Sequence, residues 1–252
     1  MATKIEWTEK TWNPVTGCTK MSEACQNCYA EVMARRLSGM PASKEKYKNG
    51  FQVTLHPEAL EEPLGWRKPQ MVFVVSMGDL FHEDVPFEYI DRVMDIIRRT
   101  PQHTYQVLTK RASRMAEYFD SRLTPKNVWL GVTCESPRHY DRISHLRQIP
   151  ATVRFLSCEP LLGDMADVWL GGIDWVITGG ESGAKARRTP VEWFRHLRDQ
   201  CRQSNVPFFF KQWGAWGEDG VKRSKYLNGS KLDGREWKEY PSLGHTLTTV
   251  ND

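Results

Sequence analysis

Short runs of apolar and β-branched residues recur along this chain, and amphipathic stretches separate them. The runs that predict β-strands are Lys4–Trp7, Phe51–Leu55, Met71–Ser76, Thr104–Thr109, Val128–Thr133, Val153–Cys158, Trp175–Thr178 and Pro207–Phe210. Several of them, such as Val72–Val75, are apolar without alternation, which is typical of parallel strands covered on both faces. The pattern therefore predicts a buried parallel sheet.

Helical periodicity occurs between these runs. One predicted helix after Pro86 places its apolar residues on a single face, at Phe87, Ile90, Val93, Met94 and Ile97. Ser136 followed by Pro137 marks the start of a second helix. Thr189, Pro190 and Glu192 have the spacing of an N-cap, a first-position proline and a capping box, and they predict a third.

Repeated strand–helix units imply a parallel sheet with right-handed crossovers. Up to eight strands in roughly 210 residues predict an α/β protein with a complete or partial (β/α) barrel. A doubly wound open sheet is the alternative. After Gln212 the chain is rich in Gly, Lys and Trp and has no strong period. We therefore expect a barrel at residues 1–213 and a small C-terminal extension, residues 214–252, packed on the barrel.

Composition narrows the class of protein. A net charge of +4 and a pI near 8.7 permit a polyanionic partner without requiring one. No apolar run approaches the roughly 20 residues of a membrane span. The first residues lack the apolar segment of a secretory leader, so we expect a cytoplasmic protein whose six cysteines are reduced. Three of the six, Cys134, Cys158 and Cys201, are isolated in apolar surroundings and are expected in the core.

The other three, Cys18, Cys25 and Cys28, have the spacing C-x6-C-x2-C, which is typical of metal sites. Three thiolates leave one coordination position open. Structural zinc would need a fourth ligand from His56, His82 or a distant cysteine. The alternative is a [4Fe–4S] cluster whose fourth iron binds S-adenosylmethionine, the cofactor that such clusters cleave to a 5′-deoxyadenosyl radical.

Polar residues follow the predicted strands at their carboxyl ends, where parallel barrels place their active sites. Ser76 and Asp79 follow one strand, and Lys211 follows the last. Three other strands end alike, in a hydroxyl residue, one or two small residues and a glutamate: Glu135, Glu159 and Glu181. For any one glutamate, capping of the next helix is the simpler interpretation. Three at matched positions predict convergence on one rim with the cysteine loop, where Gly179-Gly180 leaves room for a ligand.

These residues belong to longer motifs. The motifs are the segments 12–18, 25–30, 73–82, 108–111, 157–161, 178–183 and 208–214. Together they resemble the phage three-cysteine-motif family of radical-S-adenosylmethionine-like proteins, over nearly the whole chain. The resemblance implies a barrel of the radical SAM type. It also implies that some members isomerise an N-linked glycinyl group on a thymidine of phage DNA to a C-linked one.

The resemblance further implies roles for individual residues. Cys18, Cys25 and Cys28 would hold the cluster. Ser76, Asp79 and Glu135 would bind S-adenosylmethionine, and Glu159, Glu181 and Lys211 would line the substrate cavity. Most radical SAM enzymes have C-x3-C-x2-C with an aromatic residue before the last cysteine, whereas Asn27 stands there in this chain. Tyr29, two residues later, is the candidate for the cofactor contact that the missing aromatic would make.

Basic residues cluster in predicted rim loops, near tryptophans that can stack a base. The clusters are Lys44/Lys46/Lys48, Arg67-Lys68, Lys110-Arg111-Arg114, Lys185/Arg187/Arg188 and Lys222-Arg223/Lys225, and the tryptophans are Trp66, Trp213 and Trp216. Solvated charge and core tryptophans are the alternative, since 31 acidic residues nearly balance 35 basic ones. The resemblance favours DNA as partner, with an electron donor, in the host cytoplasm if the protein is phage-encoded. A zinc-stabilised nucleic-acid-binding protein and an electron-transfer or sensing centre stay as alternatives.

Overall fold

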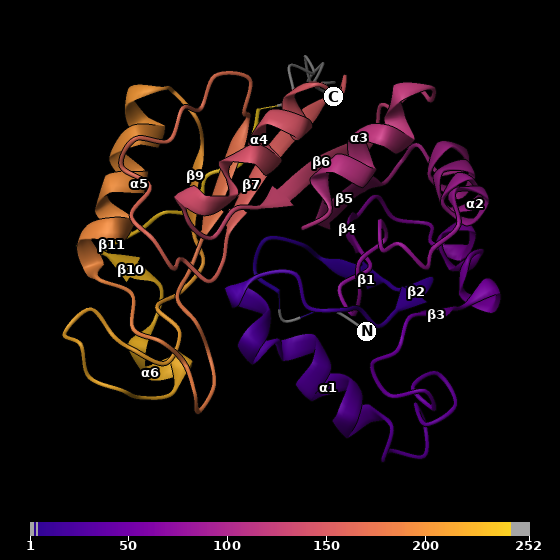
Figure 1. Cartoon of the computed structure of the whole chain (residues 1–252), viewed down its shortest axis with the longest axis horizontal. Coiled ribbons are helices and arrows are strands. Elements are labelled where there is room, and N and C mark those ends of the chain that lie inside the picture. Colours follow the sequence, from indigo (N-terminus) through magenta and orange to yellow (C-terminus); the bar gives the residue numbers. More distant parts are fainter. Residues whose placement is uncertain (1–2, 4, 243–252) are drawn as a thin grey trace, which may run out of the picture.

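A computed structural model describes residue 3 and residues 5–242. Its main sheet has seven parallel strands that neighbour one another in the order β1 (Lys10–Trp12), β4 (Met71–Val74), β5 (Thr104–Thr109), β6 (Val128–Thr133), β7 (Val153–Cys158), β8 (Trp175–Thr178) and β9 (Phe208–Phe210). The strand order follows the chain without a reversal, which excludes the doubly wound alternative for this sheet. The sheet curls into a partial barrel (Figure 1).

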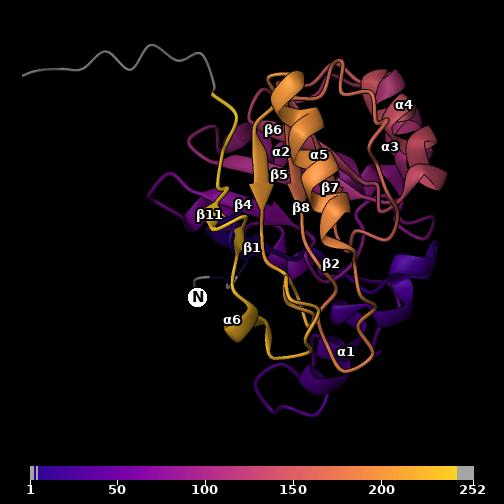
Figure 2. The same ribbon diagram turned by 90° about the vertical axis from the view of Figure 1, so that its left-hand side faces the viewer.

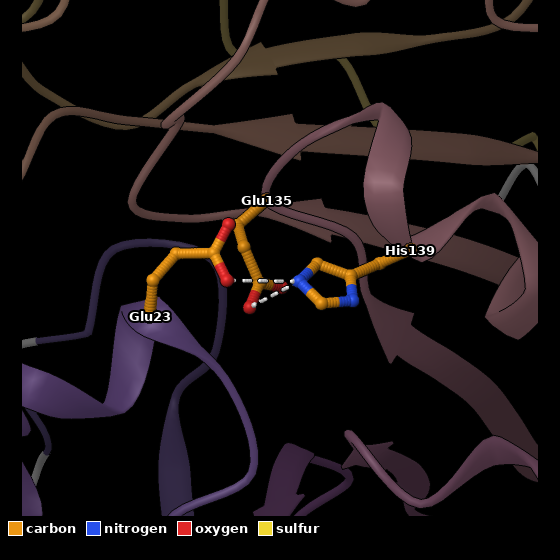
Figure 3. Close-up of side chains that lie close together, drawn as sticks. All are labelled: Glu23, Glu135 and His139. Carbon is orange, nitrogen blue, oxygen red and sulfur yellow. Dashed lines mark hydrogen bonds and ion pairs between the residues drawn. The ribbon is translucent and has the colours of Figure 1, made fainter.

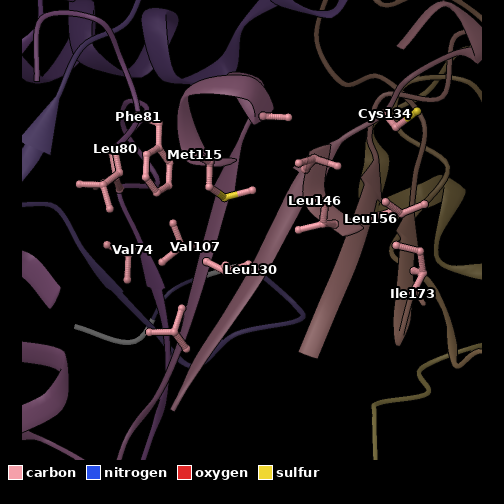
Figure 4. Close-up of a cluster of buried hydrophobic side chains, with 14 of the residues drawn as sticks. Val74, Leu80, Phe81, Val107, Met115, Leu130, Cys134, Leu146, Leu156 and Ile173 are labelled. Carbon is pink, nitrogen blue, oxygen red and sulfur yellow. The ribbon is translucent and has the colours of Figure 1, made fainter. Parts of the chain in front are cut away.

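Four helices lie on the convex face of the sheet: α2 (Phe87–Arg99), α3 (Ala112–Asp120), α4 (Tyr140–Arg147) and α5 (Val191–Gln203). Their apolar faces pack on outward-facing aliphatic side chains of the strands. Figure 4 shows part of this core, with Val74, Val107, Leu130 and Leu156 from successive strands beneath Met115 and Leu146 from two of the helices. Cys134, Cys158 and Cys201 belong to this core, as predicted.

Shorter elements surround the barrel. They are β2 (Val15–Thr16) paired antiparallel with β3 (Thr54–Leu55), the 3-10 helices η1 (Glu23–Asn27), η2 (Pro57–Ala59), η3 (Glu62–Gly65) and η4 (Pro137–His139), the helices α1 (Tyr29–Leu37) and α6 (Lys225–Asn228), and the hairpin of β10 (Lys231–Leu232) and β11 (Arg235–Glu236). Figures 1 and 2 place α1 and α6 at the same end of the molecule.

Aromatic side chains fill the amino-terminal part of the concave face. They are Trp7, Phe73, Trp129, Phe155, Trp175 and Phe209. Gly131 is required in this layer, because a Cβ atom there would lie 2.4 Å from the ring of Phe155. Since side chains alternate along a strand, the next inward positions, Ser157 on β7 and Lys211 after β9, lie above the aromatic layer. The layer therefore forms a floor, and polar side chains gather near the carboxyl ends of the strands.

Two strand predictions were wrong. The first strand is β1 rather than Lys4–Trp7, of which Lys4 lies outside the described residues. Trp7 instead enters the aromatic layer, with its ring 4.7 Å from that of Phe73, and the gain in buried area outweighs strand pairing for this segment. Within Phe51–Leu55, only Thr54–Leu55 is a strand, and it pairs with β2 outside the main sheet.

The predicted helix start at Ser136-Pro137 is confirmed, since Ser136 precedes η4 and α4 follows it, but the capping box predicted at Thr189 is absent. The hydroxyl of Thr189 donates a hydrogen bond to the carbonyl oxygen of Leu161 (2.7 Å), and Pro190 precedes the first residue of α5. The hydroxyl of Ser136 donates to Glu23 (3.3 Å), a residue of the cysteine loop. Both side chains therefore link loops at the carboxyl ends of the strands. Neither caps the helix that follows it.

The described part of the predicted C-terminal extension, residues 214–242, lies along β9 and the N-terminal segment. The backbone N–H of Phe210 donates to the carbonyl oxygen of Trp237 (2.8 Å), and Lys238 pairs with Glu6 (2.6 Å). These contacts cover the exposed edge of β9. The boundary after residue 213 stays a prediction, and residues 243–252 lie outside the described part. None of the described helices is long and apolar enough to cross a membrane.

Candidate functional site

The cysteine loop begins directly after β2, beside the end of β4. Gly17 has a φ of +87°, and its N–H donates to the carbonyl oxygen of Met77 (2.9 Å). A Cβ atom at Gly17 would lie 2.1 Å from the carbonyl oxygen of Gln52, so only glycine fits. The next residue, Cys18, donates its N–H to the carbonyl oxygen of Phe51 (3.1 Å). The backbone at the first cysteine is therefore held from two sides.

Residues between Cys18 and Cys28, most of them in the six-residue gap before Cys25, attach the loop to several strand ends. The Thr19 hydroxyl bonds to Nε2 of His82 (2.9 Å), after β4. The hydroxyl of Ser22 donates to the carboxylate of Glu135, after β6. Asn27, in the place of the missing aromatic residue, donates to the carbonyl oxygen of Lys185 (3.1 Å), after β8. The unusual length of this loop thus supplies contacts across the mouth of the half-barrel.

Arg111 makes many polar contacts in this region, although the sequence predicted for it only a place in a basic cluster of the rim loops. It is 3% exposed. Its Nη1 lies 3.4 Å from the sulfur of Cys18 and 3.3 Å from Oδ2 of Asp79, and its Nε lies 2.8 Å from Oε2 of Glu83. Arg111 directly follows β5, so its position at a strand end could have indicated a role at this site.

The environments of two cysteines differ. Burial, together with the charge of Asp79, raises the pKa of Cys18 to about 11, although Arg111 partly offsets this. Burial alone would raise the pKa of Cys25, but hydrogen bonds from the backbone at Met21 and the charge of Lys110 bring it below its ordinary value. Since the thiolate is the form that binds metals, Cys25 is the readier ligand of the two.

In the described part of the chain, the three thiols are not gathered as the ligands of a single zinc ion. Tetrahedral ligands about 2.3 Å from zinc place their sulfurs within about 4 Å of one another. Among the described residues, the three sulfurs do not all lie within 4.8 Å of one another. The proposed fourth ligands are also engaged: His82 accepts from the N–H of Asp84 (3.1 Å) and bonds to Thr19, and His56 bonds to Thr16 (2.8 Å) and Glu58 (3.2 Å).

The residues predicted to bind the cofactor lie near this loop, and they differ in their hydrogen-bond partners. Asp79 accepts hydrogen bonds from the Thr109 hydroxyl (2.7 Å) and the N–H of Lys110 (3.2 Å), so its carboxylate ties β4 to β5. The hydroxyl of Ser76 donates to Oδ1 of Asn13 (3.2 Å), and its carbonyl oxygen accepts from the Tyr29 hydroxyl (2.5 Å). Asn13, to which the sequence gave no role, also accepts a hydrogen bond from the backbone N–H of Met77, in the loop after β4 (3.0 Å).

Glu135 is fully buried at the end of β6 and faces the cysteine loop (Figure 3). One oxygen lies 2.9 Å from Nη1 of Arg142 and the other lies 3.5 Å from Nε2 of His139, which also lies 3.3 Å from Glu23. These two carboxylates and the imidazole are close enough to share an ion. Arg142 already compensates the charge of Glu135, so we interpret the group as the attachment of the loop rather than a second metal site.

Glu181, after β8, is similarly occupied. Its Oε1 lies 2.5 Å from Nη2 of Arg187, and its Oε2 accepts from the N–H (2.7 Å) and Nε (2.9 Å) of the same residue. Burial would raise the pKa of Glu181, but hydrogen bonds from Arg187 and Asn27 bring it below the ordinary value. Glu181 therefore stabilises the loop after β8 and the cysteine loop beside it.

Glu159 and Lys211 have few other partners. Oε1 of Glu159 lies 3.1 Å from Nζ of Lys211, and the two side chains are 14% and 25% exposed. They come from β7 and β9, and the pair forms because β8 ends in glycines between them. A Cβ atom at Gly179 would lie 2.8 Å from the Glu159 carboxylate, and one at Gly180 would lie 1.9 Å from the carbonyl oxygen of Trp213. The room expected here for a ligand is taken by these protein groups.

A cavity of about 530 Å³ lies elsewhere, at the amino-terminal ends of β8 and β9, where Ile173, Asp174, Val206 and Pro207 contribute to its lining. It is remote from the cysteines and brings no cluster of titratable groups together. The chemistry of this chain is concentrated at the opposite ends of the strands.

Comparisons with known proteins agree with this architecture. A cysteine-to-serine mutant of spore photoproduct lyase matches with a TM-score of 0.51 at 12% identity, over 88% of this chain and 69% of that one. Spore photoproduct lyase complexed with dinucleoside spore photoproduct matches with a TM-score of 0.47 at 11% identity, over 75% and 59%. The first match confirms the predicted partial (β/α) barrel of the radical SAM type.

The comparison with curated proteins finds no match to this sequence. The likeness to spore photoproduct lyase is one of fold, and membership of the phage three-cysteine-motif family stays a prediction. A family model described as "Protein of unknown function (DUF5131)" matches residues 2–241. The match covers nearly the whole chain, and the protein therefore belongs to the DUF5131 family.

Proposed function

We propose that this protein is a radical S-adenosylmethionine enzyme that acts on a modified thymidine in DNA. Cys18, Cys25 and Cys28 would hold a [4Fe–4S] cluster, and the chemistry that this group would supply, given an external electron donor, is the one-electron reductive cleavage of S-adenosylmethionine. The observation that carries the proposal is the position of the three-thiol loop, which is tied across the carboxyl ends of a parallel half-barrel at Glu135 and Lys185.

The residues around the loop orient these ligands. Arg111 donates to the sulfur of Cys18 and neutralises charge that would otherwise accumulate beside Asp79. Tyr29 keeps its hydroxyl on the carbonyl oxygen of Ser76 while 58% of its surface is exposed. Its ring is therefore available for the contact with S-adenosylmethionine that an aromatic residue makes in related loops, and Ser76 and Glu135 are the nearby polar groups.

Glu159 and Lys211 suit a substrate that carries an amino acid substituent. A glycinyl group offers one carboxylate and one amine. The Lys211 ammonium pairs with the first, and the Glu159 carboxylate accepts hydrogen bonds from the second. The 3.1 Å pair is partly exposed, so each member can exchange its partner for the substrate without a charge being left unpaired.

The reaction that we propose is the isomerisation of an N-linked glycinyl group on the thymidine methyl to a C-linked one. A hydrogen atom leaves the glycinyl carbon, the bond from the thymidine methylene to nitrogen breaks, and a bond from that methylene to the glycinyl carbon forms. The hydrogen atom is then delivered to the nitrogen, which has lost its bond to the methylene, so composition and oxidation state are unchanged. The aromatic floor beneath Ser157 excludes water from the radical.

Anaerobic reconstitution with iron and sulfide, followed by metal analysis and S-adenosylmethionine cleavage under strong reductant, tests the cluster. Brown protein with about four irons per chain is expected. Zinc without iron would support the structural-zinc alternative, and a cluster that leaves S-adenosylmethionine intact would support an electron-transfer or sensing centre. Incubation with hypermodified phage DNA then tests the substrate. Nucleosides are compared by chromatographic retention and NMR, since an isomerisation does not change mass.

A further inference from the structure

Helix α6 presents two large apolar side chains to solvent. Tyr226 is 74% exposed and Leu227 is 77% exposed, and among the large apolar residues that the structure describes only Leu123 is more exposed. Two such side chains in succession are costly to leave in water and indicate a contact with a partner. Figure 2 shows α6 at the end of the molecule that also carries α1 and the cysteine loop.

The helix is short but its backbone is fixed. The N–H of Gly229 donates to the carbonyl oxygen of Lys225 (3.1 Å), and Nδ2 of Asn228 donates to that of Gly214 (3.0 Å). The N–H of Trp213, two residues after Lys211, donates to the carbonyl oxygen of Gly229 (3.2 Å). The exposed pair is therefore held rigidly on the loop that follows the candidate substrate-binding lysine.

Cavities lie on both sides of α6. One of about 380 Å³ is lined by Glu6, Gln212, Lys225 and Tyr226 among others, and Gln212 adjoins Lys211. The other, of about 430 Å³, lies between Lys222 and Lys225 and the segment 182–184 after β8. A chain that crosses α6 can thus occupy a hollow on each side and approach the Glu159–Lys211 pair from the first.

The charge around α6 is positive and partly uncompensated. Lys222 donates to the carbonyl oxygen of Ala184 (2.6 Å) and lies 5.4 Å from the ring centroid of Trp216. Lys225 lies 5.3 Å from the ring centroid of Tyr226. Within the described residues neither lysine pairs with a carboxylate. Apolar side chains beside such cations are the elements with which proteins open a base stack while holding its phosphates.

We propose that α6 is a wedge that enters duplex DNA at the target site. Tyr226 and Leu227 stack in the space that the target base leaves, and Lys222 and Lys225 contact the flanking phosphates. The base then turns out of the helix toward the Glu159–Lys211 pair. This inference rests on the proposed DNA substrate, but not on the radical chemistry.

The test uses the full-length protein and a labelled DNA duplex in which one thymine is mismatched and 2-aminopurine stands beside it. Fluorescence anisotropy measures binding, and the rise in 2-aminopurine fluorescence measures unstacking. We expect the double variant Tyr226→Ala/Leu227→Ala to bind about tenfold or more weakly and to lose the fluorescence rise. Leu123→Ala, which removes a still more exposed leucine after α3, is the control and should behave as wild type.

Lys222→Gln and Lys225→Gln test the proposed phosphate contacts, because each should lower the slope of log affinity against log salt by about 1. The wedge proposal would be overturned if the double variant unstacked the DNA as much as wild type does, with the melting temperature of the protein unchanged. That outcome would not affect the proposed radical chemistry. A wild-type protein that binds no duplex would overturn it as well. Wedge-dependent binding without S-adenosylmethionine cleavage would instead support the wedge and refute the proposed radical function.

Discussion

The two halves of the strand-end rim treat charge differently. At β4 to β6, Asp79, Arg111 and Glu135 are almost completely buried, and each makes several hydrogen bonds to protein groups. At β7 and β9, Glu159 and Lys211 are partly exposed, and their 3.1 Å contact is the main polar interaction of both side chains within the described residues.

This difference distinguishes residues that support the structure from residues that are available to bind a substrate. A buried charge whose partners are all satisfied is strongly destabilising to disturb, and it fixes the elements that it joins. A partly exposed pair loses little when one partner is exchanged. We therefore assign the buried charges at β4 to β6, together with Glu181 after β8, to holding the cysteine loop, and the Glu159–Lys211 pair at the ends of β7 and β9 to the substrate.

Removal of one loop cysteine should have the largest effect. We expect Cys25→Ala to lose most of its iron after anaerobic reconstitution and to show no detectable S-adenosylmethionine cleavage, because the cluster then lacks a ligand. Cys201→Ala is the matched control, since Cys201 is fully buried in the core behind the sheet. It should retain iron at the wild-type level. Equal iron contents in the two variants would refute the cluster assignment.

Arg111→Met should destabilise the protein by about 3–5 kcal/mol, because it leaves the buried carboxylate of Asp79 without its cation. The free energy of unfolding in urea measures the effect. Arg122→Met provides the comparison: Arg122 pairs with Asp91 at 2.7 Å, but both side chains are accessible to water, so a loss of less than about 1 kcal/mol is expected. Similar losses would mean that Arg111 does not support the loop as inferred.

Glu159→Gln and Lys211→Met should lower turnover on hypermodified DNA by about 100-fold or more, with iron content and melting temperature close to wild type. The reason is that both side chains contact substrate rather than the scaffold. Glu192→Gln, on the exposed surface of α5, is the control and should turn over normally. A fall in melting temperature with normal turnover would place the pair in the scaffold and remove the difference between the two halves of the rim.

Much of the sheet could be predicted from sequence, and so could the convergence of the strand ends. Runs such as Val128–Thr133 match the observed strands, since continuous apolar runs have few other uses in a domain of this size. The first strand could not be predicted. The segment that ends at Trp7 has a strand-like pattern, but Trp7 instead buries its ring in the aromatic floor. Nothing local in the sequence distinguishes these outcomes, which depend on a sheet built from later residues.

The sequence predicted which residues occur at the candidate site better than it predicted the role of each one. Glu135, Glu159 and Glu181 end their strands alike, yet the structure gives them different partners: Arg142, Lys211 and Arg187. Those partners lie between 6 and 52 residues away, so the tertiary structure decides which glutamate is saturated. Arg111 was missed for a similar reason, because its contacts to Cys18 and Asp79 join segments distant in sequence.

The smallest effect concerns Glu181, whose pKa is lowered below its ordinary value of 4.5 in the folded protein. A lowered pKa means that the ionised carboxylate stabilises the fold above that value, and that this contribution is lost as the pH falls through the folded-state pKa. Glu181→Gln removes the contribution, so it should cost about 1 kcal/mol at pH 7.

The difference between wild type and Glu181→Gln should therefore shrink as the pH falls below about 4.5, because both proteins then carry an uncharged side chain beside Arg187. Urea unfolding of the two proteins across this range measures it. Other carboxylates with lowered pKa values, such as Asp91, titrate in both proteins and cancel in the comparison. A difference that stays constant with pH would show that Glu181 acts through packing or neutral hydrogen bonds, and its place in the charge-supported scaffold would then be wrong.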